Sequence, residues 1–154
     1  MAQHVVDRFY TALADRDGET MAACYSDDVV FEDPAFGVLR GRNAADMWRM
    51  LCSRATDLRV QYAVRESTES SATVGWVAQY AFGATGRPVR NDITAHMKLR
   101  DGLIVDHRDQ FDLWKWSSQA LGLPGRFLGW SPPLKKKVRR TALAGLAAFQ
   151  ASPP

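Results

Sequence analysis

An alternation of apolar and polar residues between Leu58 and Asp112 is the feature that most constrains the fold. Successive side chains on a strand point to opposite faces of a sheet, so this pattern predicts strands with one buried face. Three turn-like segments, STESS, ATGRP and RDG, divide the region into four predicted strands over 58–67, 72–84, 88–100 and 103–112. Short turns between consecutive strands indicate an antiparallel meander.

The same alternation assigns residues to the two faces of the predicted sheet. The face expected to form the core carries Trp76, Ala78, Tyr80 and Phe82 of the second strand, Asn91, Ile93, Ala95, Met97 and Leu99 of the third, and Leu103, Val105, His107, Asp109 and Phe111 of the fourth. We therefore expect His107 and Asp109 to point into the core. The outer face carries Val77, Ala81 and Ile104 among polar residues, and such a mixed surface predicts a homodimer.

Helical periodicity precedes and follows these strands. We predict helices over 4–15 and 19–25, a strand from Val29 to Phe31, a loop between Gly37 and Gly41, and a helix capped by Asn43. At the C-terminus, four apolar residues at helical spacing predict a docked helix over 134–151, reached through the strap GRFLGWSPP; they are Val138, Ala142, Leu146 and Phe149. Helices followed by a meander indicate an α+β fold.

Size and composition place the chain among globular proteins. Its 154 residues fit one domain, which we divide into a main part, 1–133, and a basic amphipathic helix within 134–154. No apolar run approaches the roughly 20 residues of a membrane span, and the N-terminus lacks a secretory signal, so we expect a cytoplasmic protein without a membrane partner. Cys24 and Cys52 are isolated from one another and from histidines, which predicts buried reduced thiols without a metal.

A cluster of basic residues lies near the C-terminus, at Lys135, Lys136, Lys137, Arg139 and Arg140. Such a cluster fits either a nucleic-acid patch or a solvated helix face. No aromatic residue is interleaved with the basic ones to stack on bases, so we favour the solvated face and expect no nucleic-acid partner.

The segment FEDPAFG, which begins at Phe31, places two adjacent carboxylates at the end of an apolar strand. If Val29 and Phe31 define the buried face, Asp33 shares that face and Glu32 points to solvent. An acid at the end of a buried face is either a cap for nearby backbone amides or a functional group with a raised pKa. We favour the functional interpretation.

The run FYTALADRDGETMAACYSDDVVFEDPAFGVLRGRNAADMW resembles the opening of the nuclear transport factor 2-like superfamily, and most closely its ketosteroid isomerase and SnoaL-like polyketide cyclase branches. The resemblance extends from Val5 to about Leu121. It implies a cone-shaped, curved antiparallel sheet wrapped around the N-terminal helices, with a deep apolar pocket, and commonly a dimer formed through the outer sheet face.

The resemblance also implies roles for individual residues. Asp33 matches the aspartate that shuttles a proton in ketosteroid isomerase, and Tyr25 matches a tyrosine that supports its oxyanion hole. The two principal donors of that hole fall on Phe9 and Ala95, which cannot donate. Asp109 lies in RDQFD, which resembles a segment of limonene epoxide hydrolase that carries a catalytic aspartate. The partners of that aspartate fall on Trp76 and Ala78.

Together these residues suggest a cofactor-independent enzyme that moves a proton on a hydrophobic carbonyl compound, with Asp33 as base and His107 and Asp109 as further catalytic residues. The alternatives are a non-catalytic module that binds a hydrophobic ligand or serves assembly, and an epoxide hydrolase that uses Asp109. The substrate-binding residues expected in either enzyme are Tyr25, Trp48, Trp76, Tyr80, Asn91, Met97 and Phe111. The sequence shows no glycine-rich phosphate loop, zinc motif or nucleotide fingerprint, so we expect neither cofactor nor metal.

Overall fold

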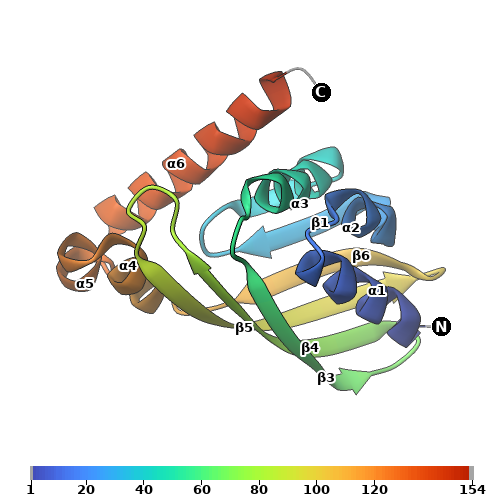
Figure 1. Ribbon diagram of the computed structural model, residues 1–154. Coiled ribbons are helices and arrows are strands. Elements are labelled where there is room, and N and C mark those ends of the chain that lie inside the picture. Colours follow the sequence, from blue (N-terminus) through green and yellow to red (C-terminus); the bar gives the residue numbers. More distant parts are fainter. Residues whose placement is uncertain (1, 153–154) are drawn as a thin grey trace.

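A six-stranded curved sheet, covered on its concave face by helices, forms the body of the protein (Figure 1). The computed structural model describes residues 2–152, with side chains described from Val5 onward. In chain order the elements are α1 (Ala2–Ala14), α2 (Gly18–Cys24), β1 (Tyr25–Asp33), β2 (Gly37–Arg40), α3 (Arg42–Arg54), β3 (Arg59–Ser67), β4 (Ser71–Ala81), β5 (Pro88–Arg100), β6 (Leu103–Gln110), α4 (Leu113–Leu121), α5 (Leu123–Leu128) and α6 (Pro132–Ala151). This arrangement confirms the expected α+β fold.

The strands follow the order β2-β1-β6-β5-β4-β3, so the sheet has two edges and is not a closed barrel. Strands β3 to β6 form the predicted antiparallel meander. The pair β1–β6 is parallel, however, and here the expectation of a fully antiparallel sheet is wrong. A hairpin turn fixes antiparallel pairing, whereas β1 and β6 are far apart in the chain and their relative direction is set by packing.

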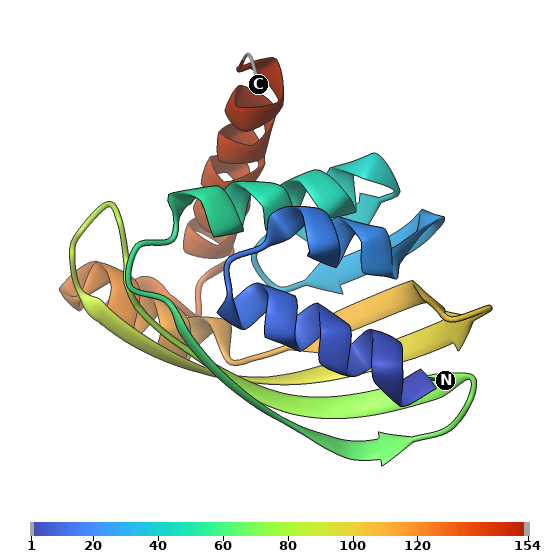
Figure 2. The ribbon, with the colours of Figure 1, turned by 45° about the vertical axis from the view of Figure 1, so that its right-hand side comes forward.

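The helices α1, α2 and α3 lie across the concave face of the sheet, and the strands β3 to β5 curve beneath α1 (Figure 2). The buried core joins apolar side chains of these helices to the alternating residues of the strands, and Val29 and Phe31 define the buried face of β1 as predicted. Both cysteines are buried and unpaired. Within residues 2–152, no helix is long and apolar enough to cross a membrane.

A bulge in β6 changes the predicted alternation. Lys98 pairs with Asp106 and Leu99 with Ile104, so Val105 is an extra residue in the ladder. Ile104 is consequently fully buried, and its predicted place on the outer face is wrong. Residues after the bulge keep the predicted parity, with His107 and Asp109 on the core side. The homodimer stays a prediction, but Ile104 cannot belong to its interface.

Three local predictions also differ from the structure. The segment expected as a loop is the short edge strand β2, which pairs with β1 from Val30↔Arg40 to Asp33↔Gly37. Helix α3 begins after Gly41, whose positive φ of 55° turns the chain, and Asn43 is not its cap. Part of the predicted strap forms α5, in which Pro124 takes an early position that tolerates proline.

The predicted C-terminal helix is present as α6 and packs against α3 and the β1–β2 turn. Ser131 caps its first turn, and Leu146 is buried in the core cluster with Ala142 and Phe149 packed against it. Polar contacts fix the helix at both ends. The Arg139 guanidinium donates to the Pro34 carbonyl at 3.2 Å, and Gln150 Nε2 donates to side chains of α3.

Leu146 provides a test of how firmly α6 is docked. Leu146→Ala removes buried methyl groups and leaves a cavity, so we expect it to lower the free energy of unfolding by about 2 to 4 kcal/mol. Leu143→Ala is the matched control, because Leu143 lies one turn earlier and is 38% exposed; its effect should stay within about 0.5 kcal/mol. Urea unfolding of both variants measures the difference, and equal effects would contradict the docking.

Candidate functional site

The parallel pairing of β1 with β6 brings two carboxylates to one end of the sheet. Phe31 pairs with His107 and Glu32 with Arg108, so Asp33 and Asp109 follow on the concave side of the two strands. Strand β1 ends at Asp33, and the Asp33 Oδ1 atom accepts a hydrogen bond from the Phe36 amide at 2.6 Å. Asp33 is therefore a cap for the β1–β2 turn, which was the alternative interpretation, and it is also placed beside a second acid.

The environment of Asp33 favours its protonated form. Burial raises the pKa of this carboxyl from 3.8 to about 7; the Phe36 amide opposes the rise, and the nearby Asp109 charge adds to it. A carboxyl with such a pKa is divided between its two protonation states near neutral pH. It can therefore both accept and return a proton under physiological conditions.

A chain of hydrogen bonds links Asp109 to the interior of the cone. Trp48 Nε1 donates to the Tyr25 hydroxyl at 2.7 Å, and this hydroxyl is 2.7 Å from His107 Nδ1. His107 Nε2 is 2.9 Å from Asp109 Oδ1, which also accepts from Trp76 Nε1 at 3.3 Å. Of the five residues in this chain, Tyr25, Trp48 and Trp76 were expected near the site, and His107 and Asp109 were expected to share the core face of the sheet.

The donors and acceptors in this chain determine the tautomer of His107. An indole nitrogen can only donate, so the Tyr25 oxygen accepts from Trp48 and its own proton is free for His107 Nδ1. Nδ1 then accepts, and the ring proton on Nε2 is donated to Asp109. We infer a neutral His107 protonated on Nε2, because this arrangement satisfies each group once and leaves no buried hydrogen without an acceptor.

Aromatic side chains fill the interior around His107. Its ring centroid lies 5.1 to 6.1 Å from those of Phe9, Tyr25, Phe31 and Trp48. The imidazole is fully buried and both of its nitrogens have partners, so it cannot contact a ligand in this arrangement. His107 points into the core as predicted, but this geometry disagrees with the expectation that it acts directly as a catalytic residue.

A pocket of about 380 Å³ lies where β1 turns away from β6. Its lining residues are Glu32, Asp33, Pro34, Arg108, Asp109, Gln110, Phe111 and Arg139. Asp33, Asp109 and Phe111 were expected in such a pocket. Glu32 was expected to point to solvent, but the pocket lies at the end of the ladder and receives side chains from both faces, Glu32 and Arg108 among them. Arg139, which the sequence did not indicate, reaches it from α6.

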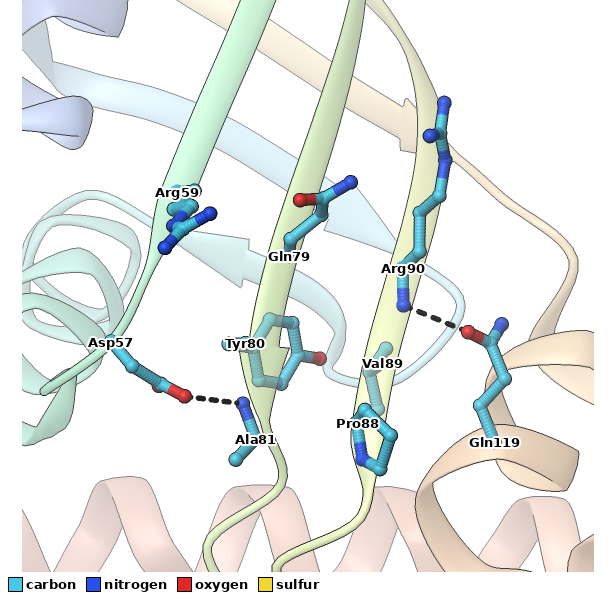
Figure 3. A pocket seen from close by; sticks show the side chains of 9 residues that line it. All are labelled: Asp57, Arg59, Gln79, Tyr80, Ala81, Pro88, Val89, Arg90 and Gln119. Atoms are coloured by element: carbon cyan, nitrogen blue, oxygen red, sulfur yellow. Dashed lines mark hydrogen bonds between the residues drawn. The ribbon is translucent and has the colours of Figure 1, made fainter.

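A second, more open hollow of about 520 Å³ lies across the ends of β3, β4 and β5, next to α4 (Figure 3). It is lined by Asp57, Arg59, Gln79, Tyr80, Ala81, Pro88, Val89, Arg90 and Gln119. Asp57 accepts from the Ala81 amide and Gln119 from the Arg90 amide, so these two side chains serve the backbone. Tyr80 is the one predicted substrate-binding residue among those that line this hollow.

The remaining predicted lining residues are part of the core or lie outside it. Trp48, Trp76, Asn91 and Met97 are buried and line neither pocket. Trp114 is exposed on α4, and Trp116 Nε1 donates to the Tyr80 hydroxyl at 2.7 Å. Asp112 caps α4, accepting from the Lys115 amide.

In the described part of the chain, no group of three or more histidine, cysteine, aspartate or glutamate side chains is placed to hold a metal ion. The pocket itself is lined by carboxylates and guanidinium groups. The two acids at the sheet end could exchange protons with a ligand, and Arg108 and Arg139 could bind negative charge that develops on it.

Comparisons with known proteins bear on the family and the fold. Residues 6–107 match the family model described as SnoaL-like domain. No curated protein is significantly similar to the chain in sequence.

Several solved structures share the fold. A hypothetical protein with a ketosteroid isomerase-like fold from Catenulispora acidiphila, in complex with trimethylamine, has a TM-score of 0.68 at 16% identity, covering 86% of this chain and all of its own. An LEH-like epoxide hydrolase of M. tuberculosis has a TM-score of 0.62 at 23% identity, and the match covers 81% of this chain and 93% of the hydrolase. A protein from Silicibacter described as a candidate polyketide cyclase has a TM-score of 0.66 at 18% identity, and the match covers 77% of this chain and 93% of that protein. These structures show that the fold is shared, and the match of residues 6–107 to the SnoaL-like domain model confirms the expected family.

The raised pKa of Asp33 predicts a specific pH dependence of stability. A carboxyl whose pKa is higher in the folded state contributes stability below its unfolded pKa of about 4, and that contribution is lost as the pH rises through about 7. Asp33→Asn keeps an acceptor for the Phe36 amide and removes the charge. At pH 8 we expect the variant to be more stable than the wild type by about 4 kcal/mol, because the pKa of Asp33 rises from 3.8 in the unfolded chain to about 7 in the folded one; this advantage should vanish near pH 4.

Urea unfolding of both proteins across this range measures the effect. Glu66→Gln, at an exposed position on β3, is the matched control and should change stability little at any pH. A difference between wild type and Asp33→Asn that is the same at pH 4 and pH 8 would contradict the raised pKa.

Proposed function

Because the chain belongs to the SnoaL-like domain family, we propose that it is a small-molecule enzyme that transfers a proton on a hydrophobic carbonyl compound without a cofactor. The reaction would be an isomerisation or a cyclisation. The observation that carries the proposal is the Asp33 carboxyl, which has a pKa of about 7 and lines a pocket together with Asp109. A base is most effective when its pKa lies near the operating pH.

In the proposed step, ionised Asp33 removes a proton from the carbon next to the substrate carbonyl. The C–H electron pair moves toward the carbonyl oxygen, which becomes an enolate, and the Asp33 carboxyl then returns its proton to another carbon. The two ketosteroid isomerase donors are replaced by Phe9 and Ala95, and His107 is not accessible. Arg139 is our candidate for binding the enolate, because its guanidinium lines the same pocket as Asp33.

Asp109 has a different role in this proposal. Its Oδ1 accepts from both His107 and Trp76, and these two bonds fix the position of the carboxyl group. The Asp109 charge in turn contributes to the raised pKa of Asp33. His107 and Tyr25 act as positioning residues, since they reach the pocket only through Asp109.

One observation favours the non-catalytic alternative. Trp48, Trp76 and Met97 are buried in the core cluster, which leaves the middle of the cone occupied by protein side chains. A binding or assembly module needs no deep pocket, whereas a polycyclic substrate in an enzyme must lie at the rim or displace some of these side chains.

Epoxide hydrolysis is a further alternative, supported by the structural similarity to the LEH-like epoxide hydrolase and by Asp109. Asp109 would have to activate water, yet one oxygen of this carboxylate already accepts two hydrogen bonds. The partner positions of the hydrolase fall on Trp76 and Ala78, which cannot supply a second charge.

Hydrogen–deuterium exchange into a panel of polycyclic ketones tests the proposed base. General base catalysis contributes about 10² to 10⁴ in rate, so Asp33→Asn should lower the catalysed exchange by that factor while ketone binding persists. Asp27→Asn is the matched control, because Asp27 lies exposed near the start of the same strand. If no ketone that binds exchanges faster with wild type than with Asp33→Asn, the binding module replaces the enzyme as the better account.

The same assay carries a pH prediction. The base works only when ionised, so the exchange rate should rise with pH, reach half of its maximum near the Asp33 pKa of about 7, and level off above it. Rates measured between pH 5 and pH 9 provide the profile. A profile already flat above pH 5 would mean that a carboxyl with an ordinary pKa is the base.

A further inference from the structure

Large apolar side chains are concentrated on the surface of α4, α5 and the residue pair that follows. Leu123 is 66% exposed, Phe127 64% and Trp130 56%, and Trp114 and Leu128 are about half exposed. Among the exposed large hydrophobic residues of the described chain, five lie in this segment of seventeen residues, and the other three are dispersed over β2, α3 and α6. A concentration of this kind marks an interaction surface, whereas single exposed apolar residues do not.

These side chains are held in place by the local structure. Trp114 Nε1 donates to the Arg126 carbonyl at 2.9 Å and Trp130 Nε1 to the Phe127 carbonyl at 2.9 Å. Gly125 lies so close to Ser117 of α4 that a larger residue could not be accommodated, and this contact holds α5 against α4. The exposed rings therefore belong to a defined surface and not to a loose tail.

The charge of this part of the chain is entirely positive. From Leu113 to the C-terminus there are seven lysines and arginines and no aspartate or glutamate, whereas the preceding 112 residues have 13 basic and 17 acidic residues. Five of the seven lie on the first half of α6, within ten residues of Trp130. The first half of α6 adjoins α4 and α5 at the same corner of the molecule in both views (Figures 1 and 2).

We propose that this corner docks on an anionic lipid bilayer. We define the α5–α6 surface as Trp114, Leu123, Phe127, Leu128 and Trp130 with Lys135, Lys136, Lys137 and Arg140. Tryptophan and leucine side chains enter the boundary between head groups and acyl chains, and lysines and arginines bind the lipid phosphates. The expectation of no membrane partner rested on the missing span, and surface attachment needs none.

The composition of the surface distinguishes this occupant from others. A second copy of the chain would bring two surfaces of the same sign together, which electrostatic repulsion disfavours. A nucleic acid would use the cations and the aromatic rings, but Leu123 and Leu128 can neither stack on bases nor form hydrogen bonds with them. An anionic bilayer uses the aliphatic, aromatic and basic side chains together. The inference does not depend on the reaction proposed above.

Binding of the full chain to vesicles tests the proposal. We expect co-sedimentation with vesicles of phosphatidylcholine and phosphatidylserine in equal parts, weak binding to phosphatidylcholine alone, and a blue shift of tryptophan fluorescence on binding. Each cation near an anionic surface contributes roughly a factor of five, so the triple variant Lys135→Gln, Lys136→Gln, Lys137→Gln should bind about 100-fold more weakly. The double variant Leu123→Ser, Phe127→Ser should lose the blue shift and most of the binding.

Matched control variants show whether a loss of vesicle binding is specific to this surface or follows from removing any exposed cation or apolar side chain. The triple variant Arg8→Gln, Arg40→Gln, Lys98→Gln removes three exposed cations elsewhere, and Val38→Ser removes an exposed apolar side chain of β2; both should bind as the wild type does. Thermal unfolding of every variant checks that the fold is kept.

Three results would overturn the proposal. They are equal binding to both kinds of vesicle, equal losses in the control variants, and an absence of vesicle binding. In the last case, binding to a single-stranded oligonucleotide would assign the surface to nucleic acid, and self-association that is lost in Leu123→Ser, Phe127→Ser would assign it to a second copy.

Discussion

The parallel pairing of β1 with β6 is the interaction on which the candidate site depends. It joins two segments more than 70 residues apart and places Phe31 beside His107 and Glu32 beside Arg108. The next step along both strands brings Asp33 next to Asp109. Without this register, Asp33 would be an ordinary cap for the β1–β2 turn and Asp109 a buried acid with two donors. The proximity of the two carboxylates, and its contribution to the pKa of Asp33, follow from the pairing.

Hydrogen bonds inside the cone offset the free-energy cost of burying polar side chains there. Tyr25, Trp48, His107 and Asp109 form a single chain in which every donor has an acceptor, and a partly satisfied chain would be more costly than an apolar core. This arrangement explains why a histidine can be fully enclosed by Phe9, Phe31 and Trp48. It also means that the aromatic residues expected to line a ligand pocket serve mainly to enclose and orient Asp109.

Much of the fold follows from the sequence because one physical rule, alternation on a half-buried sheet, holds over most of β3 to β6. The rule fails at Val105, where a bulge adds a residue and buries Ile104; no local feature of the sequence marks this bulge. The parity of Asp33, His107 and Asp109 could be predicted, since it depends only on neighbouring residues. The contact of His107 with the Tyr25 hydroxyl could not, because Tyr25 comes from β1, far away in the chain, and the contact depends on tertiary packing.

In the C-terminal region too, the sequence predicts the helix but not its tertiary contacts. Helical spacing predicted α6, and Leu146 docks it as expected, but spacing alone could not show that the exposed side of α5 is apolar or that Arg139 turns toward Pro34. Lys135 and Arg139 are one turn apart, which is about 6 Å along a helix. The same stretch of α6 therefore belongs to the α5–α6 surface and to the wall of the pocket. A hydrophobic substrate partitions into lipid, so an enzyme attached through this surface would have its pocket about one helical turn from the place where such a substrate accumulates.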